Sequence, residues 1–109
     1  MIDTGAIEYI RQNLPKEELL AQLAEECAEL GKAALKLRRA YSGVNPTPVT
    51  RAEAFSNLVE EVADVTLCLE VLYLNSEEVQ YNCDRIWEEK AVRWKNRLME
   101  EVARMHEKA

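Results

Sequence analysis

Two short acidic motifs contain the residues of this sequence that are best suited to chemistry. Glu26 and Glu29 are three positions apart, and so are Glu61 and Asp64. Residues three apart on a helix lie on one face, with Cβ atoms about 5–6 Å from each other, so each pair can direct two carboxylates toward one point. Two such helices facing each other would supply four carboxylates, and oxygen ligands of this kind suit a hard cation such as Mg²⁺. The spacing therefore predicts a divalent metal site.

Composition is that of an ordinary globular protein. The chain has 109 residues, of which 48% are hydrophobic and 31% charged, and its net charge is −6. The length predicts one domain, residues 1–109, and the acidic balance argues against a nucleic-acid or anionic membrane surface. No stretch reaches the roughly 20 apolar residues of a membrane span, and the start lacks the basic and apolar segments of a signal peptide.

The cysteines, three in number, include no C-x-x-C pair. An odd set does not suit a disulfide framework in a chain this short. Free thiols in a reducing compartment are therefore expected, which predicts a cytoplasmic protein.

Helical periodicity, interrupted by turn residues, predicts an all-α chain folded as an antiparallel helical bundle. A short helix is expected at residues 3–13, and long helices at 15–41, 51–74 and 77–105. Gly43 suits the position just after a helix C-terminus, and Thr50 and Glu53 form a capping box. Asn75 or Ser76 can cap the last helix.

Apolar residues at steps of three and four predict the faces on which the long helices pack. The stripe of the first comprises Leu19, Leu23, Cys27, Leu30, Ala34, Leu37 and Tyr41. That of the second comprises Phe55, Leu58, Val62, Val65, Leu69 and Tyr73. The third can turn Val79, Cys83, Ile86, Trp87, Trp94, Leu98 and Val102 inward. Glu26 falls at the edge of its stripe, where an unpaired carboxylate is costly and needs a cation or a proton; a glutamate that reaches water is the alternative.

Residues 65–74 are apolar almost all round, which is typical of a helix that is buried on every side. Two other helices of one chain can hardly cover it. The sequence therefore predicts a four-helix-type core that is completed by oligomerisation, with the stretch at or near a subunit interface.

The acidic motifs read Glu25-Glu26-Cys27-Ala28-Glu29 and Glu61-Val62-Ala63-Asp64. They match the pattern E-E-x-x-E followed by E-x-x-D. With them, residues 17–97 resemble the all-α nucleoside-triphosphate pyrophosphohydrolases of the MazG-like superfamily, in particular the small single-domain members of bacteria and phages.

The resemblance implies a metal-dependent hydrolase that uses Mg²⁺, with Mn²⁺ as the alternative. It would cleave a nucleoside triphosphate between the α and β phosphates, giving a monophosphate and pyrophosphate. The implied metal ligands are Glu26, Glu29, Glu61 and Asp64. The implied catalytic residues are Glu25, Glu26 and Glu61, of which Glu25 would orient or deprotonate the water. The implied substrate contacts are Lys90, Arg93, Asn96 and Arg97.

Two other classes of function stay open at this point. One is a non-catalytic regulator that binds metal and nucleotide, and the other is a structural helical oligomer whose acids are solvated. The expected partners are the nucleotide and further copies of the chain, as a dimer or a tetramer, with neither nucleic acid nor membrane. The preferred base and sugar are not predicted, because no stretch resembles the base-recognising part of a particular member of this superfamily. Trp87 and Trp94 are seven residues apart and are expected to pack in a core rather than to stack on a base.

Overall fold

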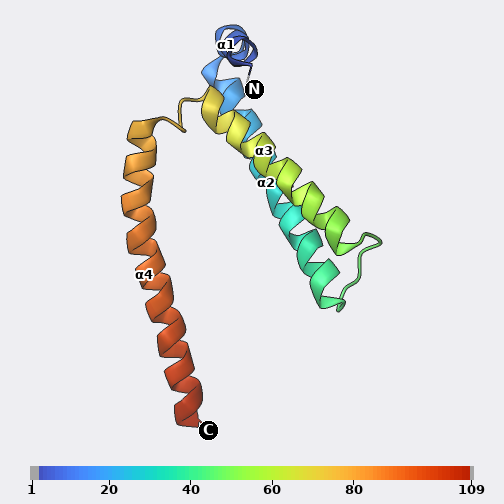
Figure 1. Cartoon of the computed structure of the whole chain (residues 1–109), viewed down its shortest axis with the longest axis vertical. Helices are drawn as coiled ribbons and strands as arrows, with labels where there is room; N and C mark the ends of the chain where they lie inside the picture. Colours follow the sequence, from blue (N-terminus) through green and yellow to red (C-terminus); the bar gives the residue numbers. More distant parts are fainter. Residues whose placement is uncertain (1–2, 109) are drawn as a thin grey trace. The chain divides into compact units, whose positions relative to one another are not determined.

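The chain folds entirely into helices and their connections over residues 3–108, which the computed structural model describes, and these residues include no strand. The helices of this range are α1 (Thr4–Asn13), α2 (Lys16–Ser42), α3 (Arg51–Val71) and α4 (Glu77–Lys108) (Figure 1). The prediction of an all-α chain is confirmed. None of these helices is both long and apolar enough to cross a membrane.

Two compact units make up the chain. The N-terminal unit, Met1–Asn75, contains α1, α2 and α3, and the C-terminal unit, Ser76–Ala109, contains α4. In the N-terminal unit α3 packs against both α2 and α1. The single domain that the length predicts stays a prediction.

The C-terminus of α2 and the N-terminus of α3 are capped by the residues that the sequence predicted. Gly43 has φ 67°, the left-handed conformation that a glycine adopts without strain, and its N–H donates to the carbonyl of Arg39 at 3.1 Å. At the start of α3, the hydroxyl of Thr50 accepts the N–H of Glu53 at 3.1 Å. The predicted turn and N-cap are confirmed.

The C-terminus of α3 lies three residues before the predicted end at residue 74. The N–H of Leu74 donates to the carbonyl of Leu69 at 2.8 Å, and that of Tyr73 to Glu70 at 3.1 Å. This is a Schellman motif, which requires a left-handed residue, and Tyr73 takes that place with φ 59°. The prediction was wrong because the apolar pattern continues through the turn.

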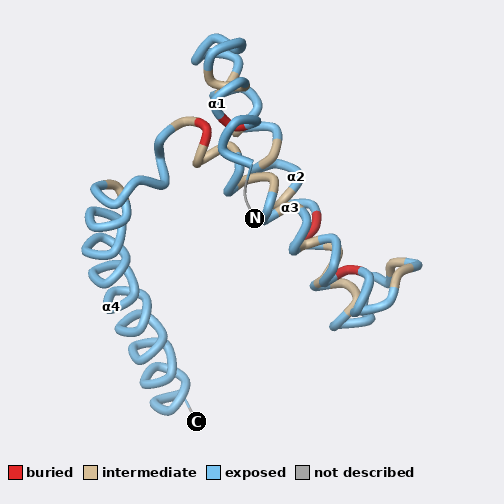
Figure 2. The backbone as a smooth tube through the Cα atoms, turned by 45° about the horizontal axis from the view of Figure 1, so that its top comes forward, coloured by how far each residue is buried: buried red, intermediate tan, exposed pale blue. Residues whose placement is uncertain are grey.

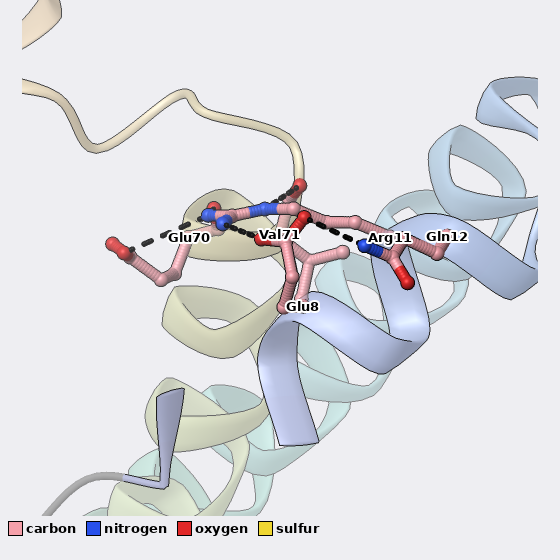
Figure 3. A network of polar contacts seen from close by, with 5 residues as sticks. All are labelled: Glu8, Arg11, Gln12, Glu70 and Val71. Carbon is pink, nitrogen blue, oxygen red and sulfur yellow. Dashed lines mark hydrogen bonds and ion pairs between the residues drawn. The ribbon is translucent and has the colours of Figure 1, made fainter. Parts of the chain in front are cut away.

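Arg11 of α1 binds this helix end (Figure 3). Its Nε donates to the carbonyl of Val71 at 3.0 Å, and its Nη2 donates to the carbonyl of Glu70 at 2.6 Å. The guanidinium lies 3.8 Å from the centre of the Tyr73 ring, and Nη1 pairs with Glu8 at 3.1 Å. One side chain therefore joins α1 to α3 and contacts the left-handed residue.

The interface between α2 and α3 is formed by residues that recur along each helix at steps of three and four. Ala33 of α2 and Ala54 of α3 are buried there, and the remaining positions are half-buried (Figure 2). On α2 the face comprises Leu19, Leu23, Glu26, Leu30, Ala33, Leu37 and Ala40. On α3 it comprises Ala54, Leu58, Glu61, Val65 and Cys68.

The predicted stripes of α2 and α3 were therefore wrong in part. On α2, Cys27, Ala34 and Tyr41 are exposed, and on α3, Phe55, Val62 and Tyr73 are exposed. Each helix carries two neighbouring apolar stripes, and the predicted stripe combined residues of both. The face in contact has an acidic residue in its middle on both helices.

α4 begins as predicted and ends later than predicted. The hydroxyl of Ser76 accepts the N–H of Val79 at 3.3 Å, so Ser76 caps the helix, which extends to Lys108 rather than to residue 105. Within its own unit Val79 is half-buried, and the other residues expected to pack inward are exposed, including Trp87 at 75% and Trp94 at 63%. Their packing against other helices stays a prediction.

Candidate functional site

A cluster of three carboxylates lies between α2 and α3. Glu26 comes from α2, and Glu61 and Asp64 come from α3. Each offers one carboxylate oxygen, and these oxygens all lie within 4.8 Å of one another. Glu26 and Glu61 meet because both occupy positions of the contact face, where the repeat would ordinarily place an apolar residue. Asp64 follows Glu61 by three residues and so lies on nearly the same face.

Glu26 is held by a neighbour on its own helix. The side-chain amide of Gln22 donates to Oε1 of Glu26 at 2.8 Å. The two residues are four apart, which is the spacing at which helical side chains meet. Gln22 was not identified from the sequence, although its place one turn before an inward-facing glutamate could have indicated this contact.

Glu61 has an oxygen without a hydrogen-bond partner among the described residues. Its Oε2 is buried and accepts no hydrogen bond from residues 3–108. Burial raises the pKa of the Glu61 carboxyl, and the charges of Asp64, Glu26, Glu29 and Glu60 raise it further. A half-buried carboxylate with an unpartnered oxygen among other carboxylates is unfavourable, because it loses part of its hydration and is repelled by its neighbours. Either a proton or a cation would relieve both effects.

Glu29, the fourth expected ligand, lies outside the cluster. Its side chain is 51% exposed and pairs with Lys32 at 3.4 Å. Glu25 is also exposed, and it makes no hydrogen bond or ion pair within residues 3–108. The structure thus brings together three of the four predicted ligands, and their binding of a metal stays a prediction.

Cys68 lies close enough to the cluster for the carboxylate charges to change its pKa. Burial raises the pKa of the Cys68 thiol, and the charges of Glu26 and Asp64 raise it further, as does Cys27. All three cysteines are free, as predicted, but only Cys68 is half-buried. Its spacing of seven residues from Glu61 was the signal in the sequence that it shares the same face.

The donor set suits a hard divalent cation. The ion pairs of the described residues join Arg11, Lys32 and Arg104 to other acids, and none of them reaches Glu26, Glu61 or Asp64. Three oxygen donors without a basic neighbour form a site that Mg²⁺ can enter while keeping several waters, as it usually does in proteins.

The expected substrate contacts lie together on α4. Lys90, Arg93, Asn96 and Arg97 lie on one exposed side of this helix, together with Trp87, Trp94 and Glu100. The side chains recur at steps of three and four. This surface combines cations and one carboxylate with two exposed indole rings, and the cations and rings suit an anionic aromatic ligand.

Comparison with known proteins found no matching family model, no matching curated protein and no matching solved structure.

Proposed function

We propose that this protein is a nucleoside-triphosphate pyrophosphohydrolase that depends on Mg²⁺ and releases pyrophosphate and a nucleoside monophosphate. The observation that carries the proposal is the Glu26–Glu61–Asp64 cluster with its unpartnered Glu61 oxygen. The resemblance of the two acidic motifs to the MazG-like superfamily supports it independently of the geometry. Free thiols agree with a cytoplasmic enzyme.

Glu26, Glu61 and Asp64 would hold the metal. A divalent ion there would bind phosphate oxygens, neutralise developing charge and lower the pKa of a bound water. Glu29 would become a fourth ligand if its side chain left Lys32. Loss of this exposed ion pair would cost only about 0–1 kcal/mol. Gln22 keeps one oxygen of Glu26 in place, at 2.8 Å from its amide nitrogen.

Glu25 would orient the attacking water or remove its proton, as the resemblance implies. On α4, the cations Lys90, Arg93 and Arg97 would contact the phosphates, with Asn96 binding phosphate or sugar. The indoles of Trp87 and Trp94, which are exposed on that helix, would stack on a base, a role that differs from the core packing expected from the sequence.

A further part of the proposal is that the molecule works as a homo-oligomer. On α3, Phe55 is 56% exposed, and Val59 and Val62 are exposed beside it. They form a second apolar stripe at steps of four and three, which is the pattern of helices that pack in bundles. A second subunit on this stripe would give α3 the surroundings of a central helix in a four-helix core.

The test of the function is pyrophosphate release from a panel of canonical and modified nucleoside triphosphates, with and without Mg²⁺. The proposal expects at least one substrate to yield equimolar monophosphate and pyrophosphate, and chelation of the metal to stop the reaction. Release of inorganic phosphate instead of pyrophosphate would contradict the proposal. So would turnover that continues at the same rate after the metal has been chelated. Tight binding of metal and nucleotide without turnover would favour the non-catalytic regulator.

A further inference from the structure

The end of the N-terminal unit formed by the second half of α2, the loop after Gly43 and the start of α3 is basic, although the chain as a whole is acidic. Five charged residues lie between Glu29 and Glu53, and all five are basic. They are Lys32, Lys36, Arg38, Arg39 and Arg51. At about 100° per residue, the four on α2 fall within a sector of about 160°, on the side of the helix away from Ala33 and Leu37. They therefore form one charged surface rather than a ring of scattered side chains.

Arg51 already satisfies the C-terminal carbonyls of α2. It donates to the carbonyl oxygens of Ala40 at 3.4 Å and Tyr41 at 3.5 Å, and its guanidinium lies 4.8 Å from the centre of the Tyr41 ring. The carbonyl of Arg39 accepts the N–H of Gly43. The helix end is thus capped without the side chains of Arg38 and Arg39.

Arg38 and Arg39 have no anionic partner within residues 3–108. The ion pairs there involve Arg11, Lys32 and Arg104, and neither Arg38 nor Arg39 donates a side-chain hydrogen bond within these residues. Both guanidinium groups therefore retain all their donors. An anion in contact with both would use these donors and neutralise their charge.

A pocket lies where these two arginines meet the loop. It has a volume of about 230 Å³ and is lined by Leu35, Arg38, Arg39, Ser42, Val44 and Asn45. At about 30 Å³ per water molecule, it has room for about seven waters, or for a phosphate group with part of the molecule that carries it. Guanidinium groups bind phosphate oxygens in pairs, and the hydroxyl and amide supply further donors.

We propose that this pocket is an anion site for a phosphate-bearing small molecule, with Arg38 and Arg39 as its main contacts. It is separate from the carboxylate cluster, because Arg38 follows Glu26 by twelve residues, or about 18 Å along the helix. The inference does not rest on the proposed hydrolase activity, and the site would bind its ligand without a metal. Its small volume favours a phosphomonoester or diphosphate over a polymer backbone.

The test is calorimetric titration with inorganic pyrophosphate and, separately, with a nucleoside monophosphate, in the presence of a chelator that keeps metal from the carboxylates. We expect saturable binding that persists at physiological salt, with the backbone amide signals of Ser42, Val44 and Asn45 shifting in NMR spectra. The double variant R38Q/R39Q should bind at least tenfold more weakly. R38K/R39K, which keeps the charge without the paired donors, should also lose most of the affinity.

The matched control is R85Q/R104Q, which removes the same charge from exposed positions of α4. It should change the affinity less than twofold. Absence of binding, or an equal loss in the control, would overturn the proposal, since net charge alone would then explain the attraction. Tighter binding of a short single-stranded oligonucleotide than of either small ligand would overturn the assignment to a small molecule. Because the titration contains chelator, its failure is distinguishable from a failure of the proposed hydrolysis.

Discussion

Glu61 is the residue whose surroundings are least compatible with its charge. It occupies a contact position of α3, its Oε2 is buried without a partner, and Glu26 and Asp64 lie beside it. Hydrophobic packing would favour an apolar residue there, since a carboxylate interrupts the interface and is repelled by its neighbours. This local cost is what a bound cation would remove, and it distinguishes Glu61 from exposed acids such as Glu60 and Glu25.

Replacement of Glu61 by Gln should separate the metal site from the fold. The change keeps the shape and removes one charge, so the metal-free variant should melt at a higher temperature than the parent at pH 7. The stabilisation by Mg²⁺ should largely disappear, and turnover should fall about 100-fold or more. Melting curves with and without Mg²⁺ and an assay of pyrophosphate release measure both effects.

The control is Glu60→Gln, which removes the same charge one residue away on the exposed side of α3. It should keep the response to Mg²⁺ and most of the turnover. A metal response in Glu61→Gln equal to that of the parent would show that the metal binds elsewhere.

The pH dependence of metal-free stability follows from the raised pKa of Glu61. The folded state holds this proton more tightly than the unfolded state, in which a glutamate titrates near a pKa of about 4.3. The free energy of unfolding should therefore fall as the pH rises from that value through the higher folded pKa, and should then level off. The free energies of unfolding of the parent and of Glu61→Gln, measured in urea and plotted against pH, should run parallel in acid and diverge toward neutral pH. A difference that stays constant over this range would show that Glu61 is not the group that titrates.

At the scale of elements, the sequence predicted the helices, the pairing of Glu61 with Asp64 and part of the faces that meet, whereas Glu29 lies outside the cluster. Spacing of three residues sufficed to place Glu61 beside Asp64, and glycine and capping residues marked the helix ends at Gly43 and Thr50. The predicted stripes share Leu23 and Leu30 of α2 and Leu58 of α3 with the observed contact, but they leave out Glu26 and Glu61. In physical terms, an apolarity pattern does not include the half-buried acids of an interface.

The end of α3 shows a second limit of local patterns. A left-handed residue in a Schellman motif is usually glycine, whereas here it is Tyr73, which carries a penalty of about 1–2 kcal/mol. The contact that offsets it comes from Arg11, which is about sixty residues away in the chain and stacks on its ring. The residues near Tyr73 in the sequence give no indication of this contact.

Replacement of Arg11 by Met should therefore destabilise the N-terminal unit. It removes two charged hydrogen bonds to the carbonyls of Glu70 and Val71 and the stacking on Tyr73. The expected loss is about 2–3 kcal/mol in the free energy of unfolding, measured in urea. Arg104→Met, which removes only the exposed pair with Glu101, should cost less than about 0.5 kcal/mol. Equal effects of the two changes would mean that Arg11 acts only as a surface charge.

The small residues of the interface set how closely α2 and α3 approach. Ala54 is 1% exposed, so replacing it by Leu should force the helices apart and destabilise the protein by about 1–3 kcal/mol. Because Glu26 and Glu61 lie in the same interface, the affinity for Mg²⁺ should also fall. Ala52→Leu, at an exposed position of α3, is the matched control and should be nearly neutral. If both variants unfolded at the same urea concentration, the assigned interface would be wrong.

At the scale of the whole molecule, the apolar surface decides what kind of assembly to expect. The stripe of Phe55, Val59 and Val62 lies one residue further along than the stripe that meets α2, and so about 100° round the helix. α3 therefore has two packing faces, of which α2 covers one within the N-terminal unit. A helix with two such faces is the usual central member of a bundle.

The last prediction concerns this uncovered face. Sedimentation velocity at micromolar concentration should show a dimer or tetramer, because burial of the stripe removes apolar surface from water at about 25 cal/mol per Å², before the costs of association. The double variant Phe55→Glu/Val62→Glu should sediment as a monomer with its helical content retained, since neither side chain lies in the interface with α2. The control Tyr9→Glu, which changes an exposed aromatic residue of α1, should leave the assembly intact. A parent protein that sediments as a monodisperse monomer would remove the second subunit from the proposal, and the carboxylate site would then have to function within one chain.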